Sequence, residues 1–128
     1  MDIEAVVKTI VNCAYEVKRV LGSGFLESVY QNALIHELNK QGLKTEKEKT
    51  LTVFYKNIPV GCFRTDIIVE DSVIIETKVT DSLTKENEYQ LVNYLTATGI
   101  ITGLLINFGN RLEIKRKYMN YNKTSNEP

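Results

Sequence analysis

A predicted β-hairpin between Cys62 and Thr80 constrains this chain more than any other stretch. Two runs rich in β-branched residues are joined by Glu70–Ser72, a pattern typical of two strands and a short turn. Charged residues interrupt these runs at Asp66, Glu76 and Lys78, although strands that build a core are normally apolar. Because side chains alternate across a strand, Glu76 and Lys78 are expected on one face of the sheet.

The length of the hairpin loop decides whether the two carboxylates meet. A three-residue loop places Asp66 opposite Glu76. The same register, continued along the strands, places Arg64 opposite Lys78. A two-residue loop would instead place Asp66 opposite Thr77 and send the carboxylates to different faces. The sequence therefore predicts converging charges on one face only if the loop is odd.

Converging carboxylates at Asp66 and Glu76 would repel each other unless a cation or a proton lies between them. Oxygen ligands suit Mg²⁺, which takes one or two protein carboxylates and completes its shell with water and phosphates. Lys78 beside such an ion would hold or activate water. The alternative is an antiparallel sheet with one wet face, on which alternating charges are ordinary. Ile68 and Ile74 share the face with the charges and favour a partly covered one.

Length and charge limit the classes of protein that fit. The chain has 128 residues, enough for one compact domain, which we expect over residues 1–119 with a polar tail at 120–128. Lysine and arginine number 16, and so do aspartate and glutamate, so a nucleic-acid partner would need a local basic patch. No signal peptide or membrane span is evident, which indicates a cytoplasmic protein. Cys13 and Cys62 lack metal spacing and are expected to be small buried hydrophobes.

Hydrophobic periodicity predicts three helices, over residues 2–21, 25–40 and 84–98. Asp2 is suited to cap the first helix, and Gly22, Gly42 and Gly99 are suited to end the three helices. Glu27 lies in the first turn of the second helix, where its negative charge would stabilise the helix by interacting with the helix dipole, whether or not it has a functional role.

Alternating or continuous apolar runs predict five strands. They begin at Thr50, cover Ile58–Val69 and the second half of the hairpin, and follow the third helix at Ile100–Ile106 and around Leu112–Lys115. The order ααβββαββ predicts an α/β (α+β) fold, a mixed sheet flanked by helices. The third helix would form a right-handed crossover between parallel strands.

The order of these motifs resembles the PD-(D/E)XK nuclease superfamily, here as Asp66 followed by Glu76-Thr77-Lys78. Gln90 and Tyr94 form Gln-x-x-x-Tyr, which resembles a motif of the RecB-like exonuclease branch. The sequence GFLESVY at 24–30 is similar to the signature of the GxxExxY protein family, and the resemblance extends from about Val6 to Arg116. It implies a restriction-endonuclease-like fold.

The resemblance also implies roles for individual residues. Asp66, Glu76 and the Thr77 carbonyl would bind Mg²⁺ or Mn²⁺, and Lys78 would position water or stabilise charge. Glu27 would be the helix-borne acid of the site.

The remaining roles concern the third helix and the substrate. Gln90 and Tyr94 would shape the site, with Gln90 and Arg64 near the substrate. Family members often carry histidine near Lys18 and glutamine near Glu48; if those residues assist substrate contact, specificity or activity would differ here.

Two hypotheses of different class follow. The first is a Mg²⁺-dependent nuclease that hydrolyses phosphodiester bonds of DNA or RNA. The second is a catalytically silent nuclease-fold module that binds a protein or nucleic-acid partner. The sequence leaves a homodimer through an edge strand open, and it does not distinguish DNA from RNA.

Overall fold

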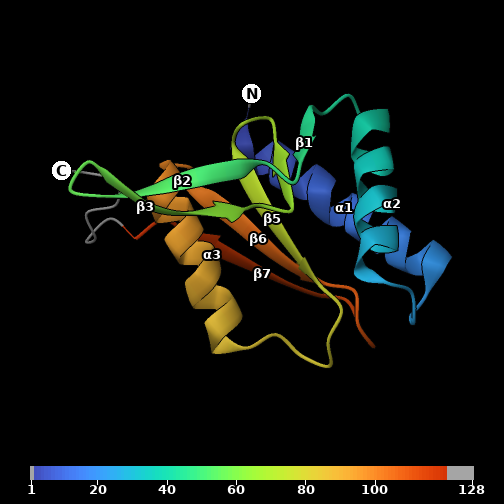
Figure 1. Cartoon of the computed structure of the whole chain (residues 1–128). Coiled ribbons are helices and arrows are strands. Elements are labelled where there is room, and N and C mark those ends of the chain that lie inside the picture. Colours follow the sequence, from blue (N-terminus) through green and yellow to red (C-terminus); the bar gives the residue numbers. More distant parts are fainter. Residues whose placement is uncertain (1, 121–128) are drawn as a thin grey trace.

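The computed structural model describes residues 2–120, which form a mixed sheet with helices on both faces (Figure 1). The elements are, in chain order, α1 (Ile3–Leu21), α2 (Glu27–Lys40), β1 (Thr45–Lys47), β2 (Thr50–Tyr55), β3 (Ile58–Arg64), β4 (Ile67–Val69), β5 (Val73–Lys78), α3 (Lys85–Thr98), β6 (Thr102–Asn107) and β7 (Glu113–Tyr118). The main sheet has the order β1-β4-β5-β6-β7, and β2 and β3 pair separately. The predicted fold class is confirmed.

Local signals explain where the helices begin and end. Asp2 caps α1 by accepting a hydrogen bond from the Glu4 amide at 3.1 Å. Thr84 and Asn87 form a reciprocal capping box at the start of α3, and Gly99 ends this helix in the left-handed conformation. The second helix begins two residues later than predicted, because Leu26 has an extended backbone with ψ at 153°.

The sheet separates two apolar cores. Side chains of β4, β5 and β6 pack on one face against α1 and α2, and the alternate side chains pack on the other face against Leu91 and Leu95 of α3. Strand β6 is buried along its whole length, as its continuous apolar sequence predicts. It pairs in parallel with β5, so the predicted crossover through α3 is confirmed.

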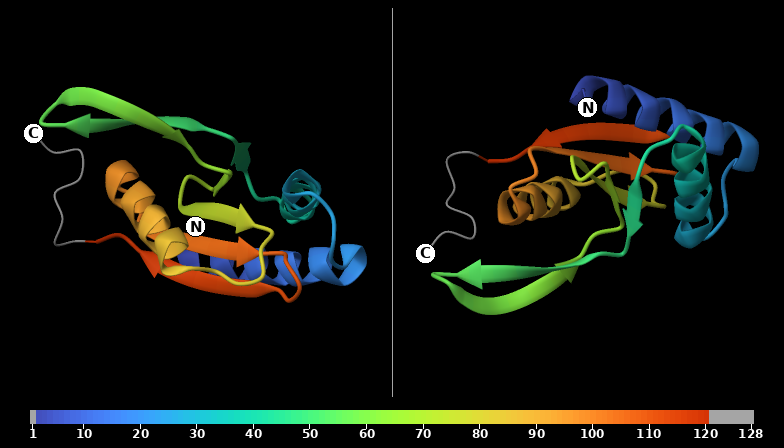
Figure 2. Two further views of the ribbon diagram at one scale, coloured as in Figure 1. Left: turned by 60° about the horizontal axis from the view of Figure 1, so that its bottom comes forward. Right: turned by 90° about the horizontal axis from the view of Figure 1, so that it is seen from above.

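The predicted single strand Ile58–Val69 is wrong, because it breaks between β3 and β4. The antiparallel segment beside it, between β1 and β2, bends at the same level, where Glu48 has a φ of 56°. Two hydrogen bonds hold the two segments together across the bend, from the Glu48 amide to the Asp66 carbonyl and from the Thr65 amide to the Lys49 carbonyl. The outer half leaves the main sheet as a separate two-stranded ribbon, β2–β3, which projects from the body (Figure 2).

Other details differ from the expectations. Five strands precede α3 rather than three, since β1 was not predicted and the ribbon divides the second strand. The last strand, β7, extends to Tyr118. Cys13 is buried, but Cys62 lies on the ribbon and is exposed, so its predicted burial is wrong.

Two further expectations concern the tail and the helices. Of the predicted polar tail, residues 121–128 lie outside the described residues. Within residues 2–120, no helix combines the length and apolar character needed to cross a bilayer.

Candidate functional site

The two carboxylates face each other across the end of the β4–β5 ladder. Val69 pairs with Val73 and Ile67 with Ile75, so the three-residue loop is confirmed. Asp66 lies next to Ile67, just outside the Ile67–Ile75 pair, and its amide donates to Glu76 Oε1 at 3.3 Å. Glu76 is only 7% exposed.

Burial shapes the protonation of this pair. Loss of water around Glu76 raises the pKa of its carboxyl to about 8, and the neighbouring Asp66 charge adds to the shift. The nearby Lys78 ammonium and the amide of Asp66 act in the opposite direction. A carboxyl pair in this state gains most from a cation that replaces its lost hydration.

Thr77 connects this pair to α2 on the opposite face of the sheet. Its amide donates to Asp66 Oδ2 at 2.8 Å, and its hydroxyl lies 3.1 Å from the same oxygen. The hydroxyl is also 2.9 Å from Glu27 Oε2. Gln31, one turn further along α2, donates to Glu27 at 2.8 Å and to Thr77 Oγ1 at 2.7 Å. These contacts bring Glu27 to the carboxylate site, although it comes from a distant part of the chain.

Burial is also the main cause of the raised pKa of Glu27. The Thr77 hydroxyl lowers this pKa, the Asp66 charge raises it, and Lys78 and Gln31 lower it to a smaller extent. Three carboxyl groups thus share one partly desolvated region.

The loop before α2 is fixed by aromatic packing and by a lysine. The Tyr30 hydroxyl donates to the Gly22 carbonyl at 2.7 Å, and the Tyr30 ring stacks on Phe108 with centroids 5.0 Å apart. Lys18 donates to the carbonyls of Phe108 and Gly109 and to Ser23 Oγ. These bonds join the start of α2 to the end of β6 and so hold Glu27 at its place.

Lys78 and the third helix complete the surroundings. Lys78 lies two residues after Glu76 on the same face of β5, and its charge lowers the pKa of both nearby glutamates against the effect of burial. Burial raises the pKa of Tyr94, and the charges of Glu76 and Asp66 raise it further. A hydrogen bond from Gln90 opposes this shift. Tyr94 therefore lies close enough to the carboxylate pair to interact with its charge, and Gln90 is linked to the site by its hydrogen bond with Tyr94.

Arg64 is not where the extended register would place it. It pairs with Thr50 in the ribbon rather than opposite Lys78, because β3 leaves the main sheet before Thr65. Its guanidinium lies 4.0 Å from Glu48, and both side chains are mostly exposed. The predicted position opposite Lys78 is wrong, and Arg64 instead lies at the base of the ribbon.

Two residues at the site were not predicted from the sequence. Gln31 is 6% exposed and bridges Glu27 and Thr77. Phe63 stacks on Tyr94 with ring centroids 3.9 Å apart. Gln31 lies at i+4 from Glu27, a spacing at which helical side chains meet, so the sequence held a signal for it. Phe63 gave none, because its contact depends on the bend of the ribbon.

The donor set fits a hard divalent cation only in part. Within residues 2–120, no three His, Cys, Asp or Glu side chains converge as a complete metal cage. Two facing carboxylates nevertheless match the usual protein share of a Mg²⁺ shell, of which water and phosphate supply the rest. Asp66 and Glu76 are the residues that fit this role.

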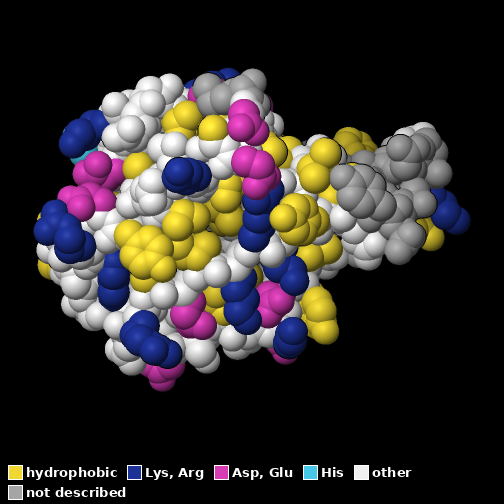
Figure 3. Space-filling model, turned by 180° about the vertical axis from the view of Figure 1, so that it is seen from behind, with side chains coloured by type: hydrophobic (Ala, Val, Ile, Leu, Met, Phe, Trp, Pro, Cys, Tyr) yellow, Lys and Arg dark blue, Asp and Glu magenta, His cyan; other side chains and the backbone are white. Residues whose placement is uncertain are grey.

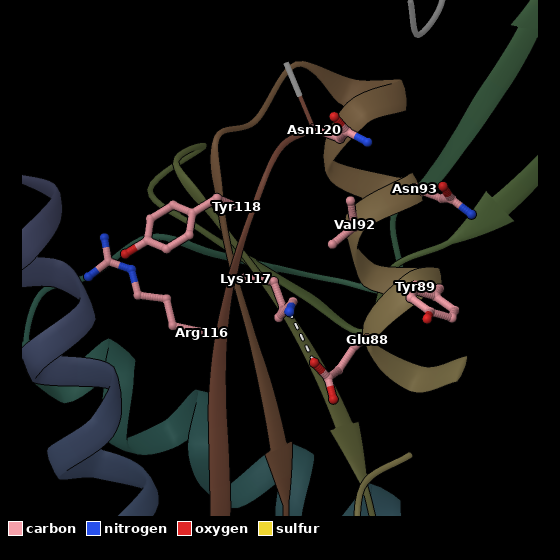
Figure 4. Close-up of a pocket in the computed structure, with 8 residues that line it drawn as sticks. All are labelled: Glu88, Tyr89, Val92, Asn93, Arg116, Lys117, Tyr118 and Asn120. Carbon is pink, nitrogen blue, oxygen red and sulfur yellow. Dashed lines mark hydrogen bonds and ion pairs between the residues drawn. The ribbon is translucent and has the colours of Figure 1, made fainter. Parts of the chain in front are cut away.

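A pocket of about 680 Å³ lies elsewhere, between α3 and β7 (Figure 4). Its charged groups are already paired, since Glu88 accepts hydrogen bonds from Lys117 at 3.0 Å and Lys115 at 3.1 Å. Arg116 pairs with Glu4 at 2.7 Å. None of the sequence-predicted site residues lines this pocket.

Comparison with known proteins supports the fold. A solved structure described as "Crystal structure of SSO0001" superposes with a TM-score of 0.59 at 19% identity, over 73% of this chain and 50% of that one. This chain therefore spans half the length of that solved chain. No curated protein matches the sequence significantly.

The family model of the PD-(D/E)XK nuclease superfamily matches residues 4–117, which includes every element described above except the last residue of β7 and the first residue of α1. A mixed sheet flanked by helices is the restriction-endonuclease-like architecture that the sequence predicted. The chain belongs to the PD-(D/E)XK nuclease superfamily.

Proposed function

We propose that this protein is a nuclease that requires Mg²⁺ or Mn²⁺ and hydrolyses phosphodiester bonds of nucleic acid. The observation that carries the proposal is the Asp66–Glu76 pair, in which Glu76 is buried, with Lys78 on the same face of β5. Membership of a nuclease superfamily supports the same activity. Hydrolysis adds water across one P–O bond and leaves a phosphate monoester and a free hydroxyl.

In this proposal Asp66, Glu76 and the backbone carbonyl of Thr77 hold the cation. When bound, the cation withdraws charge from the phosphate and makes water a better nucleophile. Lys78 positions the attacking water or stabilises charge that develops on the phosphate. Glu27 acts as the third acid, held by Gln31 and Thr77.

Residues of α3 and of the ribbon base have a second set of roles. Tyr94 closes the site beside the carboxylate pair, and Gln90 orients Tyr94 and contacts the substrate. Arg64 does not lie opposite Lys78; it is exposed at the base of the ribbon, where it contacts a phosphate of the substrate.

We further propose that the chain belongs to the GxxExxY family and acts in the cytoplasm as a single domain over residues 1–119. The contacts of Tyr30 support the narrower family, because they explain physically why a tyrosine follows the glycine and the glutamate in the GxxExxY signature. Tyr30 fixes the glycine loop, and the loop sets where α2 begins and so where Glu27 points.

One observation favours the second hypothesis, a catalytically silent binding module. Side chains of the site are joined in one hydrogen-bond network, since Asp66 accepts from the Thr77 amide and Glu27 accepts from Gln31. A superfamily member that had lost catalysis would keep such a network for stability.

Degradation of single-stranded DNA, duplex DNA and RNA in Mg²⁺ or Mn²⁺ tests the proposal. We expect metal-dependent cleavage of at least one substrate and its loss in Lys78→Ala. Lys85→Ala removes a mostly exposed lysine near Glu88 and serves as the matched control, with cleavage unchanged. Equal cleavage by wild type and Lys78→Ala would overturn the assignment, and no cleavage of any substrate would favour the silent module.

A further inference from the structure

The β2–β3 ribbon exposes large apolar side chains at its far end. Tyr55, Ile58 and Val60 are each about 60% exposed, at 61%, 59% and 59%. The ribbon contains only two strands, and its far end extends away from the main sheet (Figures 1 and 2). Because an isolated two-stranded ribbon is marginally stable in water, its exposed apolar end is unlike a core element and resembles a binding surface.

The ribbon also differs from the rest of the chain in charge. Residues 49–65 contain Lys49, Lys56 and Arg64 and no aspartate or glutamate. Because the whole chain carries 16 basic and 16 acidic side chains, the remainder has an acidic excess. On the face seen from behind, basic and acidic side chains are interspersed (Figure 3). The ribbon is thus a local basic segment in a neutral protein.

The ion pairs of the ribbon base are open to exchange. Lys49 lies 3.4 Å from Glu46, and Arg64 lies 4.0 Å from Glu48, with all four side chains at least about one-third exposed. Exposed pairs of this kind contribute little to stability, so a phosphate can replace the carboxylate partner. At the tip, the Lys56 ammonium lies 5.4 Å from the centroid of the Tyr55 ring, which places a cation beside an exposed aromatic ring.

The ribbon is connected directly to the candidate site. Strand β3 ends at Arg64, and Asp66 follows after a single residue. Phe63, the second-last residue of β3, stacks on Tyr94. Leu51 packs against the core beneath α3. A molecule lying along the ribbon would therefore reach the carboxylate pair at its base.

We propose that the β2–β3 ribbon is a nucleic-acid-binding arm that holds an unpaired strand beside the cleavage site. This inference rests on the proposed nuclease function and names the form of substrate that it takes. Tyr55 stacks on a base, which any sequence permits, while Lys56 and Arg64 contact phosphates. A six-residue strand spans about 20 Å, which is long enough to lie beside several nucleotides of an unpaired strand.

Features of the ribbon disfavour a second copy of the chain as its partner. Pro59 removes a backbone donor from β3, and the pairing register shifts between Val53 and Phe54. Proline and bulges are devices that prevent strands from pairing edge to edge. The basic charge at Lys56 would also repel the same residue of another copy.

Binding of labelled oligonucleotides, measured by fluorescence anisotropy in EDTA and again in Ca²⁺, tests the arm separately from cleavage. The probes are single-stranded DNA of roughly 15 and roughly 3 nucleotides, RNA of the longer length, and a blunt duplex. The variant is Tyr55→Thr with Lys56→Asn, because asparagine tolerates the positive φ of 48° at position 56. The control is Tyr15→Gln with Lys8→Gln, which removes an exposed ring and a charge from α1.

We expect the ribbon variant to bind the longer single strand at least about tenfold more weakly, because it loses one stacked base and one phosphate contact. Binding by the α1 control should match wild type, and wild type should bind the short strand more weakly than the longer one, because the short strand cannot reach from the tip of the ribbon to its base. The DNA and RNA probes identify which strand the arm prefers, and the duplex should bind more weakly than the single strand.

Equal affinity of wild type and ribbon variant for the longer strand would overturn the arm. Absence of any nucleic-acid binding by wild type would overturn it as well. A wild-type dimer that the ribbon substitutions convert to monomer would reassign the surface to self-association. Ribbon-dependent binding without cleavage would leave the arm standing and overturn the nuclease proposal alone.

Discussion

The ring of Phe63 stacks on the ring of Tyr94 with centroids 3.9 Å apart and an angle of 5° between the planes. This contact joins the end of β3 to α3 beside the carboxylate pair. The ribbon therefore does not hang freely from the main sheet, because its base is fixed against a residue of the candidate site.

Replacing Phe63 with leucine should weaken both the ribbon and the site. The stacked pair contributes on the order of 1 kcal/mol beyond its apolar burial, so Phe63→Leu should lower the melting temperature by a few degrees. Thermal unfolding followed by circular dichroism measures this. Tyr94→Phe retains the ring and should retain the stability, but it should reduce cleavage because the hydroxyl is lost. An equal melting temperature for wild type and Phe63→Leu would contradict a supporting role for the stack.

Gln31 should be essential for the position of Glu27. Gln31→Leu removes the amide that donates to both Glu27 and the Thr77 hydroxyl, and the expected loss of stability is about 1–3 kcal/mol. Urea denaturation measures the loss, and cleavage should fall with it. Asn32→Leu is the control, since the Asn32 side chain is exposed and accepts a hydrogen bond from Lys47 at the surface. Similar unfolding curves for the two variants would show that the bridge is dispensable.

Glu88 should make the stability of the fold depend on acid. Hydrogen bonds from Lys117 and then Lys115 are the largest causes that lower the pKa of Glu88 to about 2. Because this lies below the unfolded value of about 4.3, the stabilisation is complete above that pH and is lost as the pH falls toward 2. As the pH is lowered from about 6 to about 2, the melting temperature should fall more steeply for wild type than for Glu88→Gln. Glu86→Gln, an exposed change in the same turn, should follow wild type.

Gly109 should tolerate no side chain. A Cβ at this position would overlap the Thr80 carbonyl oxygen, a backbone atom that cannot rotate aside as a side chain can. At Gly103, a Cβ would meet the flexible end of Leu91, with the nearest atom at 2.9 Å. Gly61 on the ribbon has open space around it. Gly109→Ala should cost several kcal/mol, Gly103→Ala less, and Gly61→Ala nothing measurable, as read from denaturant unfolding. A mild effect at Gly109 would contradict the close approach to Thr80.

The register of the β4–β5 hairpin was predictable because a three-residue loop and the alternation of side chains fix it locally. That register alone brings Asp66 opposite Glu76. The cap of α1 was predictable for the same reason, since Asp2 acts on the amide of Glu4, only two residues away.

The bend of the ribbon was not predictable from hydrophobic pattern. β1 has only three residues, too few for a period, and the bend depends on a left-handed residue at Glu48 that no glycine announces. Missing the bend misplaced Arg64 and hid the contact of Phe63 with Tyr94. The network around Thr77 was also hidden, because it joins residues that lie 46 and 50 positions apart.

The most direct test of the account is calorimetric titration of Mn²⁺ into wild type, Asp66→Asn and Asp71→Asn. Asp71 is an exposed acid in the loop of the same hairpin, paired with Lys44, and it controls for loss of one negative charge. We predict one binding event per chain in wild type and in Asp71→Asn, and none in Asp66→Asn. Binding that survives Asp66→Asn, or that is absent from wild type, would contradict a cation site at the Asp66–Glu76 pair.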